Sequence, residues 1–316
     1  MMPRPPAPAR ARRLALAPMH GPGGRGAGRT VTACVGALLA LGMPLAVGAQ
    51  PAPEPGPRVV SLGGAVTETV FALGLDSLLV GVDRSSVYPP EARNLPDVGY
   101  FRTLGAEGVL SLAPEVVLAA EESGPPTVLR RLREAGVRLV EIPSESSPAG
   151  AVEKVRRVAE ALGVPARGRA LAEAMEERFA EARRLRDRRS LSPRVLFVWG
   201  QGGGSLLVSG TGTSAATMLE LAGAENAVTG FEGFKPLTAE AAVAARPDVV
   251  VVPRSTLERL GGVPGLLAVP GLAGTPAGRE GRVVTVEILS AIGFGPRTAD
   301  ALVELVRELH PELEGV

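Results

Sequence analysis

The sequence predicts an α/β protein of two α/β lobes with parallel sheets, joined by a single long rigid helix, with a ligand cleft between the lobes. Three observations predict this class. Short apolar runs alternate with stretches of helical periodicity, which is typical of parallel βα units. Residues 166–190 form one long helical stretch, and a new series of apolar runs follows it. A segment of the first half also recurs in the second half, which indicates a shared plan.

Residues 1–49 have the order of a secretory signal peptide. They carry six arginines and no acid, then the apolar run "VTACVGALLALGMPLAV", then small residues ending at Ala49. The alternative is a membrane anchor, but the run is at the short limit for a span and contains glycine and proline. Cys34, the only cysteine, stands near the start of this run, whereas a lipid-bearing cysteine follows its apolar region. We therefore expect a periplasmic chain without lipid anchor, disulfide or thiolate metal site.

The rest of the chain begins with a proline-rich lead-in at residues 50–57, which we expect to be disordered. Loss of the leader removes six arginines and none of the 33 acidic residues, so the net charge falls from +1 to −5. An acidic chain whose only lysines are Lys154 and Lys235 is a poor partner for nucleic acid. Its length favours two domains.

Residues 58–165 are predicted to form the N-terminal lobe. The expected strands are 58–63, 78–83, 115–120 and 138–143, with helices at 65–74, 106–114, 126–136 and 147–163. Glycines end several of these helices. The linking helix at 166–190 has apolar positions three or four residues apart, and its other faces are charged.

Residues 193–316 are predicted to form the C-terminal lobe. The expected strands are 194–200, 206–210, 248–253 and 282–287, and a further helix is capped by Thr213 or Ser214. The segment "GQGGGS", residues 200–205, lacks the spacing of a dinucleotide loop and leads into a strand instead of a helix. It therefore predicts a glycine-rich turn.

An internal repeat relates the two lobes. Residues 104–117, "LGAEGVLSLAPEVV", correspond to residues 237–250, "LTAEAAVAARPDVV", at a constant offset. In each copy a helix begins near a glutamate, ends at a proline and leads into a buried strand. Chance similarity between two common αβ segments is the alternative. Repeated architecture places Glu107 and Glu240 at matching positions on the two lobes.

Catalytic side chains are scarce. The only histidine after the leader is His310, which we expect at a solvated helix end. Without cysteine or a placed histidine, a Ser-His-Asp or Cys-His centre and a histidine-rich zinc site are excluded. We therefore predict that the chain is not an enzyme.

One of the two tyrosines, Tyr100, lies in the loop segment "DVGYFRTL", two residues before Arg102. In an extended loop the two side chains point to the same side. Arg102 can bind a carboxylate through two hydrogen bonds, and a nearby cation favours the phenolate form of a tyrosine. Phenolate is a ligand for ferric iron, including haem iron. The alternative is a half-buried loop tyrosine beside a surface arginine.

Five segments together resemble the haemin-binding periplasmic proteins of bacterial haem-uptake ABC transporters, relatives of the B12- and ferric-siderophore-binding proteins. They are "RVVSLGGAVTETVFALG", "LPDVGYFRTLGAEGVLSLAPEVVL", "RVLFVWGQGGG", "GFEGFKPLTAEAAVAARPDVVVV" and "VPGLAGTPAG". The resemblance covers about residues 58–310. The "DVGYFRTL" segment is its specific part, and the other segments are typical of the wider superfamily.

The resemblance implies a fold of two lobes bridged by one stiff helix, with the ligand in the cleft. It implies that Tyr100 is the axial ligand of haem iron and that Arg102 supports the ligand or its propionates. It also implies that Glu107 and Glu240 dock on arginines of a permease dimer, which works with its ATPase. The transported ligand is then haem b, carried by a monomer.

One position departs from the family pattern. Some members carry a haem-ligating histidine in the second lobe, where this chain has Gln201. We therefore expect one five-coordinate haem, with Lys235 near a propionate. Four aromatic residues are candidates to pack the porphyrin, with core packing as their alternative: Trp199, Phe231, Phe234 and Phe294. Alternative functions are a ferric-siderophore or cobalamin carrier and, in another class, a haem-processing enzyme or haem chaperone.

Overall fold

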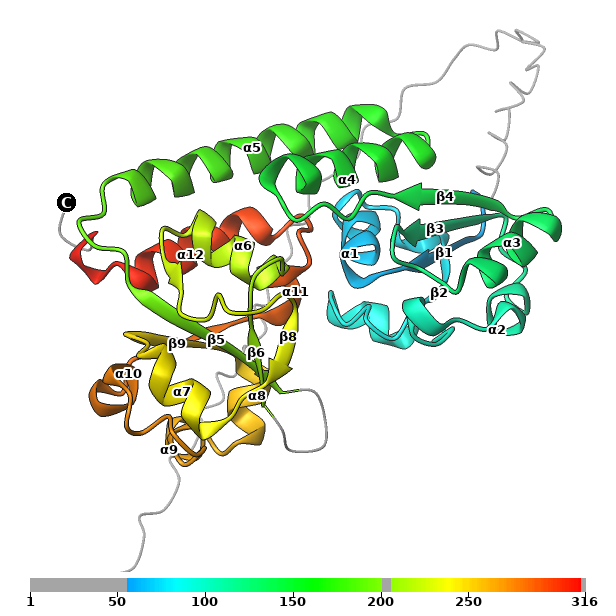
Figure 1. Cartoon of the computed structure of the whole chain (residues 1–316). Coiled ribbons are helices and arrows are strands. Elements are labelled where there is room, and N and C mark those ends of the chain that lie inside the picture. The colour runs from blue at the N-terminus through cyan, green and yellow to red at the C-terminus, as the bar shows by residue number, and fades with distance from the viewer. Residues whose placement is uncertain (1–55, 201–205, 314–316) are drawn as a thin grey trace, which may run out of the picture. The chain divides into compact units, whose positions relative to one another are not determined.

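The computed structural model describes residues 56–200 and 206–313 (Figure 1). The predicted leader and most of the lead-in lie outside the described residues. The chain divides into a unit of residues 1–53 and a unit of residues 54–316, and only the second is described below. Within the described ranges, no helix is both long enough and apolar enough to cross a bilayer.

The N-terminal lobe is built on a four-stranded parallel sheet of order β2-β1-β3-β4. Its central strands β1 and β3 are buried along their whole length, as expected for a parallel sheet covered on both faces. The elements of this lobe are β1 (Val59–Leu62), α1 (Gly64–Ala72), η1 (Asp76–Leu78), β2 (Leu79–Val82), η2 (Pro90–Asn94), η3 (Phe101–Thr103), α2 (Ala106–Leu110), β3 (Val116–Ala120), α3 (Pro126–Glu134) and β4 (Arg138–Ile142). All four strands predicted for this lobe are confirmed.

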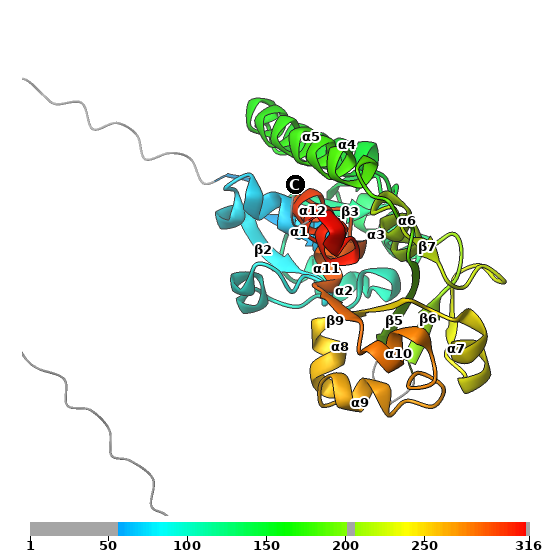
Figure 2. The same ribbon diagram turned by 90° about the vertical axis from the view of Figure 1, so that its left-hand side faces the viewer.

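A pair of helices follows the first sheet: α4 (Pro148–Ala161) and α5 (Pro165–Asp187), which lie side by side (Figures 1 and 2). Helix α5 corresponds to the predicted linking helix, but the prediction that a single helix joins the lobes is not confirmed, because α4 lies beside α5 and also packs into the second core. At Gly168 the two helices approach so closely that an added Cβ would collide with Ala159. The pair contributes apolar side chains to both cores: Val158 joins the N-terminal core, whereas Phe179 joins the C-terminal core. It therefore fastens the two lobes to each other.

The C-terminal lobe is built on a six-stranded sheet of order β10-β9-β5-β6-β8, with β7 paired to β5. Its elements are β5 (Arg194–Gly200), β6 (Leu206–Ser209), α6 (Ser214–Leu221), β7 (Glu225–Asn226), β8 (Phe234–Pro236), α7 (Ala239–Ala245), β9 (Val249–Pro253), α8 (Arg254–Arg259), α9 (Val263–Leu267), α10 (Pro276–Glu280), β10 (Val283–Val286), α11 (Ile288–Ile292), α12 (Thr298–Leu309) and η4 (Pro311–Leu313).

The expectation of a fully parallel second sheet is wrong. Strand β6 pairs antiparallel with β5, and β8 pairs antiparallel with β6. Only residues 201–205 separate β5 from β6, and a parallel connection needs a crossover of about a dozen residues or more. The sheet is therefore mixed, with β10, β9, β5 and β7 as its parallel part.

The expectation that His310 lies at a solvated helix end is also wrong. The residue is fully buried, and its Nε2 donates a hydrogen bond to the carbonyl of Ala222 at 2.9 Å. Ala222 ends helix α6, where carbonyls lack partners within the helix. The last residue of α12, Leu309, is buried in the core, and His310, which follows it, is therefore also directed into the core.

A buried ion pair connects the lobes at a second place. The carboxylate of Glu68, on α1, is 3% exposed and accepts hydrogen bonds from the backbone N–H of Arg297 at 3.0 Å and its guanidinium at 2.9 Å. The same guanidinium lies 3.3 Å from the ring centroid of Tyr88, in the loop after β2. Breaking this pair while Glu68 stays buried would leave its charge without compensation, so the pair favours the observed placement of the two lobes.

Lys154, on α4, is a second polar connection. It is 3% exposed, and its Nζ donates hydrogen bonds to the carbonyls of Gly293 at 2.9 Å and Phe294 at 3.0 Å, between α11 and α12. Burial lowers the pKa of Lys154 from 10.5 to about 8, although the nearby carboxylates of Glu122 and Glu68 act in the opposite direction.

This lowered pKa predicts a pH dependence of stability. Below pH 8, Lys154 is charged in the folded and the unfolded chain, and its burial costs stability. Between pH 8 and 10.5 the unfolded chain binds more protons than the folded chain, so the free energy of unfolding rises with pH. From pH 7 to pH 10, wild type should gain about 2–3 kcal/mol relative to Lys154→Met. Urea unfolding of both proteins at the two pH values measures this gain, and parallel pH profiles would contradict it.

Candidate functional site

The loop between β2 and α2 carries Tyr100, and its backbone is held by a series of hydrogen bonds. The N–H of Val98 bonds the carbonyl of Val82 at 3.0 Å, and the N–H of Arg84 bonds the carbonyl of Gly99 at 2.9 Å. The carboxylate of Asp97 accepts a hydrogen bond from the Gly99 N–H at 2.7 Å. Gly99 has a φ of +98°, a conformation that other residues rarely adopt. The "DVG" that precedes Tyr100 therefore sets the path of this loop.

Tyr100 and Arg102 are both placed against the buried ring of Phe101. The Tyr100 ring meets Phe101 edge to face, with centroids 5.0 Å apart, and the Arg102 guanidinium lies 4.9 Å from the Phe101 centroid. The expectation of an extended segment is wrong, because a 3-10 turn begins at Phe101. Phe101 thus organises the pair. Its position between two polar residues was a signal that the sequence interpretation overlooked.

Tyr100 itself remains accessible, at 38% exposure, whereas Phe101 is 9% exposed. The guanidinium of Arg102 is half-exposed and lies 3.7 Å from the carboxylate of Glu122. Two backbone hydrogen bonds align these segments, from Gly124 N–H to the Phe101 carbonyl and from Leu104 N–H to the Gly124 carbonyl, both at 2.9 Å. Glu122 is therefore a further residue of this site that the sequence did not indicate.

Asp83 supports the start of the loop from within the lobe. It is 1% exposed, and its carboxylate accepts hydrogen bonds from Gly63 N–H at 2.8 Å, Ser85 N–H at 2.9 Å and the Ser86 hydroxyl at 2.8 Å. The Ser86 hydroxyl also lies 2.6 Å from that of Thr67. This network ties the β1–α1 turn to the end of β2, at the carboxyl edge where ligands of parallel sheets are bound.

The candidates on the C-terminal lobe are less closely grouped. Lys235, on β8, is exposed, and its Nζ lies 4.7 Å from the ring centroid of Phe231. Within the described ranges, no hydrogen bond or ion pair joins Lys235 to Tyr100 or Arg102. Gln201 lies outside the described residues.

Three more aromatic candidates differ in accessibility. Trp199 and Phe234 are partly buried and meet edge to face at 5.8 Å between centroids. Phe294 is 1% exposed within the C-terminal core, which favours the alternative of core packing for this residue.

Glu107 and Glu240 lie in the first turns of α2 and α7, and both are exposed. Thr238 caps α7 by accepting a hydrogen bond from the Ala241 N–H at 3.1 Å. Hydrogen bonds from its own backbone N–H and from Thr238 lower the pKa of Glu240, so its carboxylate is ionised at neutral pH. The predicted equivalence of the two glutamates therefore extends to their place on a helix.

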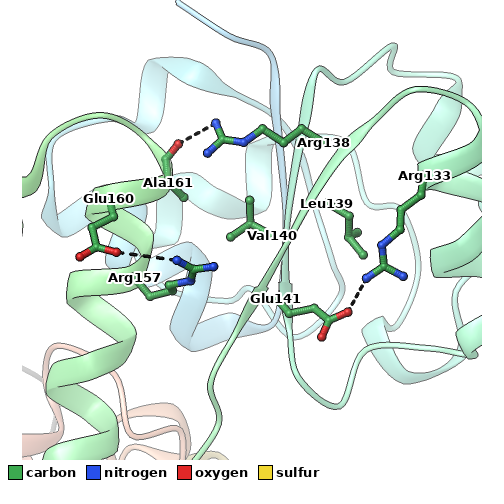
Figure 3. Close-up of a pocket in the computed structure, with 8 residues that line it drawn as sticks. All are labelled: Arg133, Arg138, Leu139, Val140, Glu141, Arg157, Glu160 and Ala161. Carbon is green, nitrogen blue, oxygen red and sulfur yellow. Dashed lines mark hydrogen bonds and ion pairs between the residues drawn. The ribbon is translucent and has the colours of Figure 1, made fainter.

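A separate hollow of about 470 Å³ lies beside β4 and α4 (Figure 3). Three arginines line it, and each is already engaged: Arg133 with Glu141, Arg157 with Glu160, and Arg138 with the carbonyl of Ala161 (Figure 3). Two of the three positive charges are thus offset by carboxylates, whereas Arg138 bonds only a neutral carbonyl. Among the residues that the structure describes, no group of three His, Cys, Asp or Glu side chains is arranged to hold a metal ion.

Two α/β lobes fastened by a helix pair, with an accessible tyrosine on a held loop, define a two-lobed substrate-binding protein. A family model for periplasmic binding proteins matches residues 59–287. The chain therefore belongs to the periplasmic binding protein family, whose members bind substrates and are not enzymes. This confirms the family and the absence of catalysis that the sequence predicted.

Solved structures and relatives agree with this membership. The periplasmic heme-binding protein RhuT from Roseiflexus sp. RS-1, in apo form, is 44% identical, covering 82% of this chain and 99% of that protein with a TM-score of 0.77. The periplasmic heme-binding protein BhuT, in complex with two hemes, is 42% identical, with coverage of 82% and 99% and a TM-score of 0.76. A cobalamin-binding protein of Halobacterium salinarum is 30% identical over 80% of this chain and 69% of its own length.

The conformation of Gly99 predicts a difference between two glycines near Tyr100. Gly99→Ala should lower the free energy of unfolding by about 1–2 kcal/mol, because its φ is positive although nothing lies within 4 Å of an added Cβ. Gly108→Ala is the matched control, since Gly108 lies within α2 and an added Cβ there meets only the Val98 carbonyl at 3.7 Å. It should stabilise the protein by up to about 1 kcal/mol. Urea unfolding that gave both variants the same sign would contradict the assigned loop conformation.

Proposed function

We propose that this chain is a periplasmic haem-binding protein that delivers haem b to an inner-membrane ABC importer. Tyr100 ligates the iron as phenolate, and Arg102 binds a propionate or supports the phenolate. Lys235, and Gln201 where it reaches the ligand, contribute from the second lobe. The observation that carries the proposal is an accessible phenol and a half-exposed guanidinium, both in contact with one buried phenylalanine in a loop fixed by hydrogen bonds. Such a donor set suits ferric haem.

The names of the most similar solved structures support haem as the ligand, since RhuT and BhuT are each described as heme-binding. Tyrosinate is an established ligand of haem iron, and the Tyr100 side chain is accessible to a ligand. One haem per chain is the proposed stoichiometry, because this chain has Gln201 where some family members carry a haem-ligating histidine in the second lobe.

Delivery requires a partner in the membrane. We propose that Glu107 and Glu240, one on each lobe, contact arginines of a permease dimer that works with its ATPase. The chain acts as a monomer, exported by the leader at residues 1–49 and without a lipid anchor. It has no nucleic-acid partner.

Cobalamin is the second candidate ligand. It is favoured by the relative from Halobacterium salinarum, which is described as a cobalamin-binding protein. In that case Tyr100 has a structural role, and the ligand is retained when its hydroxyl is removed.

Replacement of Tyr100 by phenylalanine separates the two candidates. Haemin added to the leader-free protein should give a saturable one-to-one visible spectrum with a phenolate-to-iron charge-transfer band. Tyr100→Phe keeps the ring against Phe101 but removes the ligand oxygen, so the band should vanish and affinity should fall by at least about tenfold.

Tyr88→Phe is the matched control, because Tyr88 is also 38% exposed and is the only other tyrosine of the sequence. It should keep the band and the affinity of wild type. Cyanocobalamin is titrated in parallel. Saturable cobalamin binding that survives Tyr100→Phe, with no haemin spectrum, would replace haem by cobalamin.

Haem binding should change the shape of the protein little. The helix pair α4–α5 enters both cores, and the Glu68–Arg297 pair favours the observed placement of the two lobes. Small-angle scattering with and without haemin should give the same radius of gyration within error. A rotation of the lobes on the order of tens of degrees would show that the linking helix is not rigid.

A further inference from the structure

The repeat seen in the sequence extends to the backbone that supports Glu107 and Glu240. Ala113 follows α2 with a φ of 44°, and Arg246 follows α7 with a φ of 45°. Each directly precedes a proline, and these two residues are separated by the same offset as the two glutamates. Each N–H bonds the carbonyl three residues earlier, at 2.9 Å for Ala113 and 3.3 Å for Arg246. Left-handed conformations are uncommon for residues other than glycine, so their recurrence is strong evidence for one repeated unit.

The same unit contains an arginine at the start of a central strand. In the N-terminal lobe, the backbone N–H of Arg58 bonds the carboxylate of Glu115 at 3.1 Å, and the Glu115 N–H bonds the Arg58 carbonyl at 2.9 Å. The Arg58 guanidinium then reaches the turn that follows α2, donating to the carbonyls of Leu112 at 2.6 Å and Ala113 at 3.1 Å.

The C-terminal lobe repeats the backbone bonds and one of the two guanidinium bonds of this contact set. The N–H of Arg194 bonds the carboxylate of Asp248 at 2.9 Å, and the Asp248 N–H bonds the Arg194 carbonyl at 2.8 Å. The Arg194 guanidinium donates to the carbonyl of Ala245, the last residue of α7, at 3.2 Å. The Arg194 guanidinium also donates to the Ala227 carbonyl at 3.4 Å and lies 3.5 Å from the carboxylate of Glu225. Leu112 and Ala245 are equivalent in the repeat, as are Glu115 and Asp248. We define these two sets of contacts as the arginine clamps.

Short helices depend on such contacts. Helix α2 has 5 residues and α7 has 7, which is too short for stability in isolation. Their last carbonyls lack partners within the helix, and a cation there is favoured by the helix dipole. The Arg194 clamp therefore binds the last residue of α7 to the first residue of β5, and the Arg58 clamp binds the turn after α2 to the residue that precedes β1.

We propose that Arg58 and Arg194 are positioning residues of the docking surface, holding α2 and α7 so that Glu107 and Glu240 keep a fixed spacing. This inference rests on the proposed docking of the two glutamates on a permease. The clamps are exposed, so their loss changes global stability little, and their effect is local order at the two helices.

The chain provides matched controls. Arg138, on β4, donates to the Ala161 carbonyl at 3.1 Å, and Arg282, just before β10, donates to the Leu309 carbonyl at 3.1 Å. Both are arginines near the start of a strand that bond the end of a helix, but these helices, α4 and α12, carry neither glutamate.

The test compares Arg58→Ala, Arg194→Ala and the double variant with Arg138→Ala, Arg282→Ala and the glutamate variants Glu107→Ala and Glu240→Ala. Amide hydrogen exchange is followed on the leader-free proteins, and haemin affinity is measured by titration. Growth on haemin as the only iron source is measured in the source strain lacking this gene and complemented with each full-length variant.

The clamp variants should accelerate exchange in α2 or α7 by about three- to tenfold, because each loses one or two hydrogen bonds. They should bind haemin as wild type does yet support growth as poorly as the glutamate variants, whereas the two control variants grow normally. Normal growth of the clamp variants beside impaired glutamate variants would overturn the inference alone. Normal growth of the glutamate variants would overturn the proposed docking, and the inference with it.

Discussion

The structure depends on one helix pair that belongs to two cores. Apolar side chains of α4 and α5 pack into both the N-terminal and the C-terminal core, so neither lobe can move without disturbing this packing. The polar contacts of Glu68 with Arg297 and of Lys154 with two carbonyls also set the relative orientation of the lobes, because they are formed only in one placement of α1, α4 and α12. Burying a charge costs free energy, and here the two buried charges find their hydrogen-bond partners only in the observed arrangement of the lobes.

The two lobes share the repeated unit of strand, arginine clamp and glutamate-bearing helix, but they differ in the side chains that could contact a ligand. The strand, clamp and glutamate-bearing helix recur, and the bonds of Arg58 to Leu112 and of Arg194 to Ala245 are equivalent, which suits a common role on the two lobes. The proposed iron ligand does not recur. At the offset that relates the two glutamates, Phe101 corresponds to Phe234 and Arg102 to Lys235, but Tyr100 corresponds to Gly233. The second lobe also differs in its sheet, where β6 and β8 pair antiparallel. The proposed iron chemistry therefore belongs to the N-terminal lobe.

Much of the fold could be predicted from the sequence wherever neighbouring residues alone determine the element. Buried apolar strands, the long helix and the repeat around Glu107 and Glu240 were all visible as patterns. The antiparallel pairing of β6 was not, because apolar content does not reveal strand direction. The burial of His310 was missed because its partner, the Ala222 carbonyl, is distant in sequence. The lobe boundaries at 58–165 and 193–316, and the roles of Tyr100 and Arg102, stay predictions.

The Arg102–Glu122 pair explains how the proposed site can be both ordered and ready for an anion. The backbone around Arg102 is fixed by the hydrogen bonds of Gly124 with Phe101 and Leu104. The charged groups of Arg102 and Glu122 are half-exposed and 3.7 Å apart. Exposed pairs of this kind contribute about 1 kcal/mol or less, so a ligand carboxylate can take over the guanidinium with little loss. A propionate that forms two short hydrogen bonds gains more than Glu122 gives up. The backbone contacts around Phe101 thus order the loop, whereas the Arg102 guanidinium can exchange Glu122 for a carboxylate of the ligand.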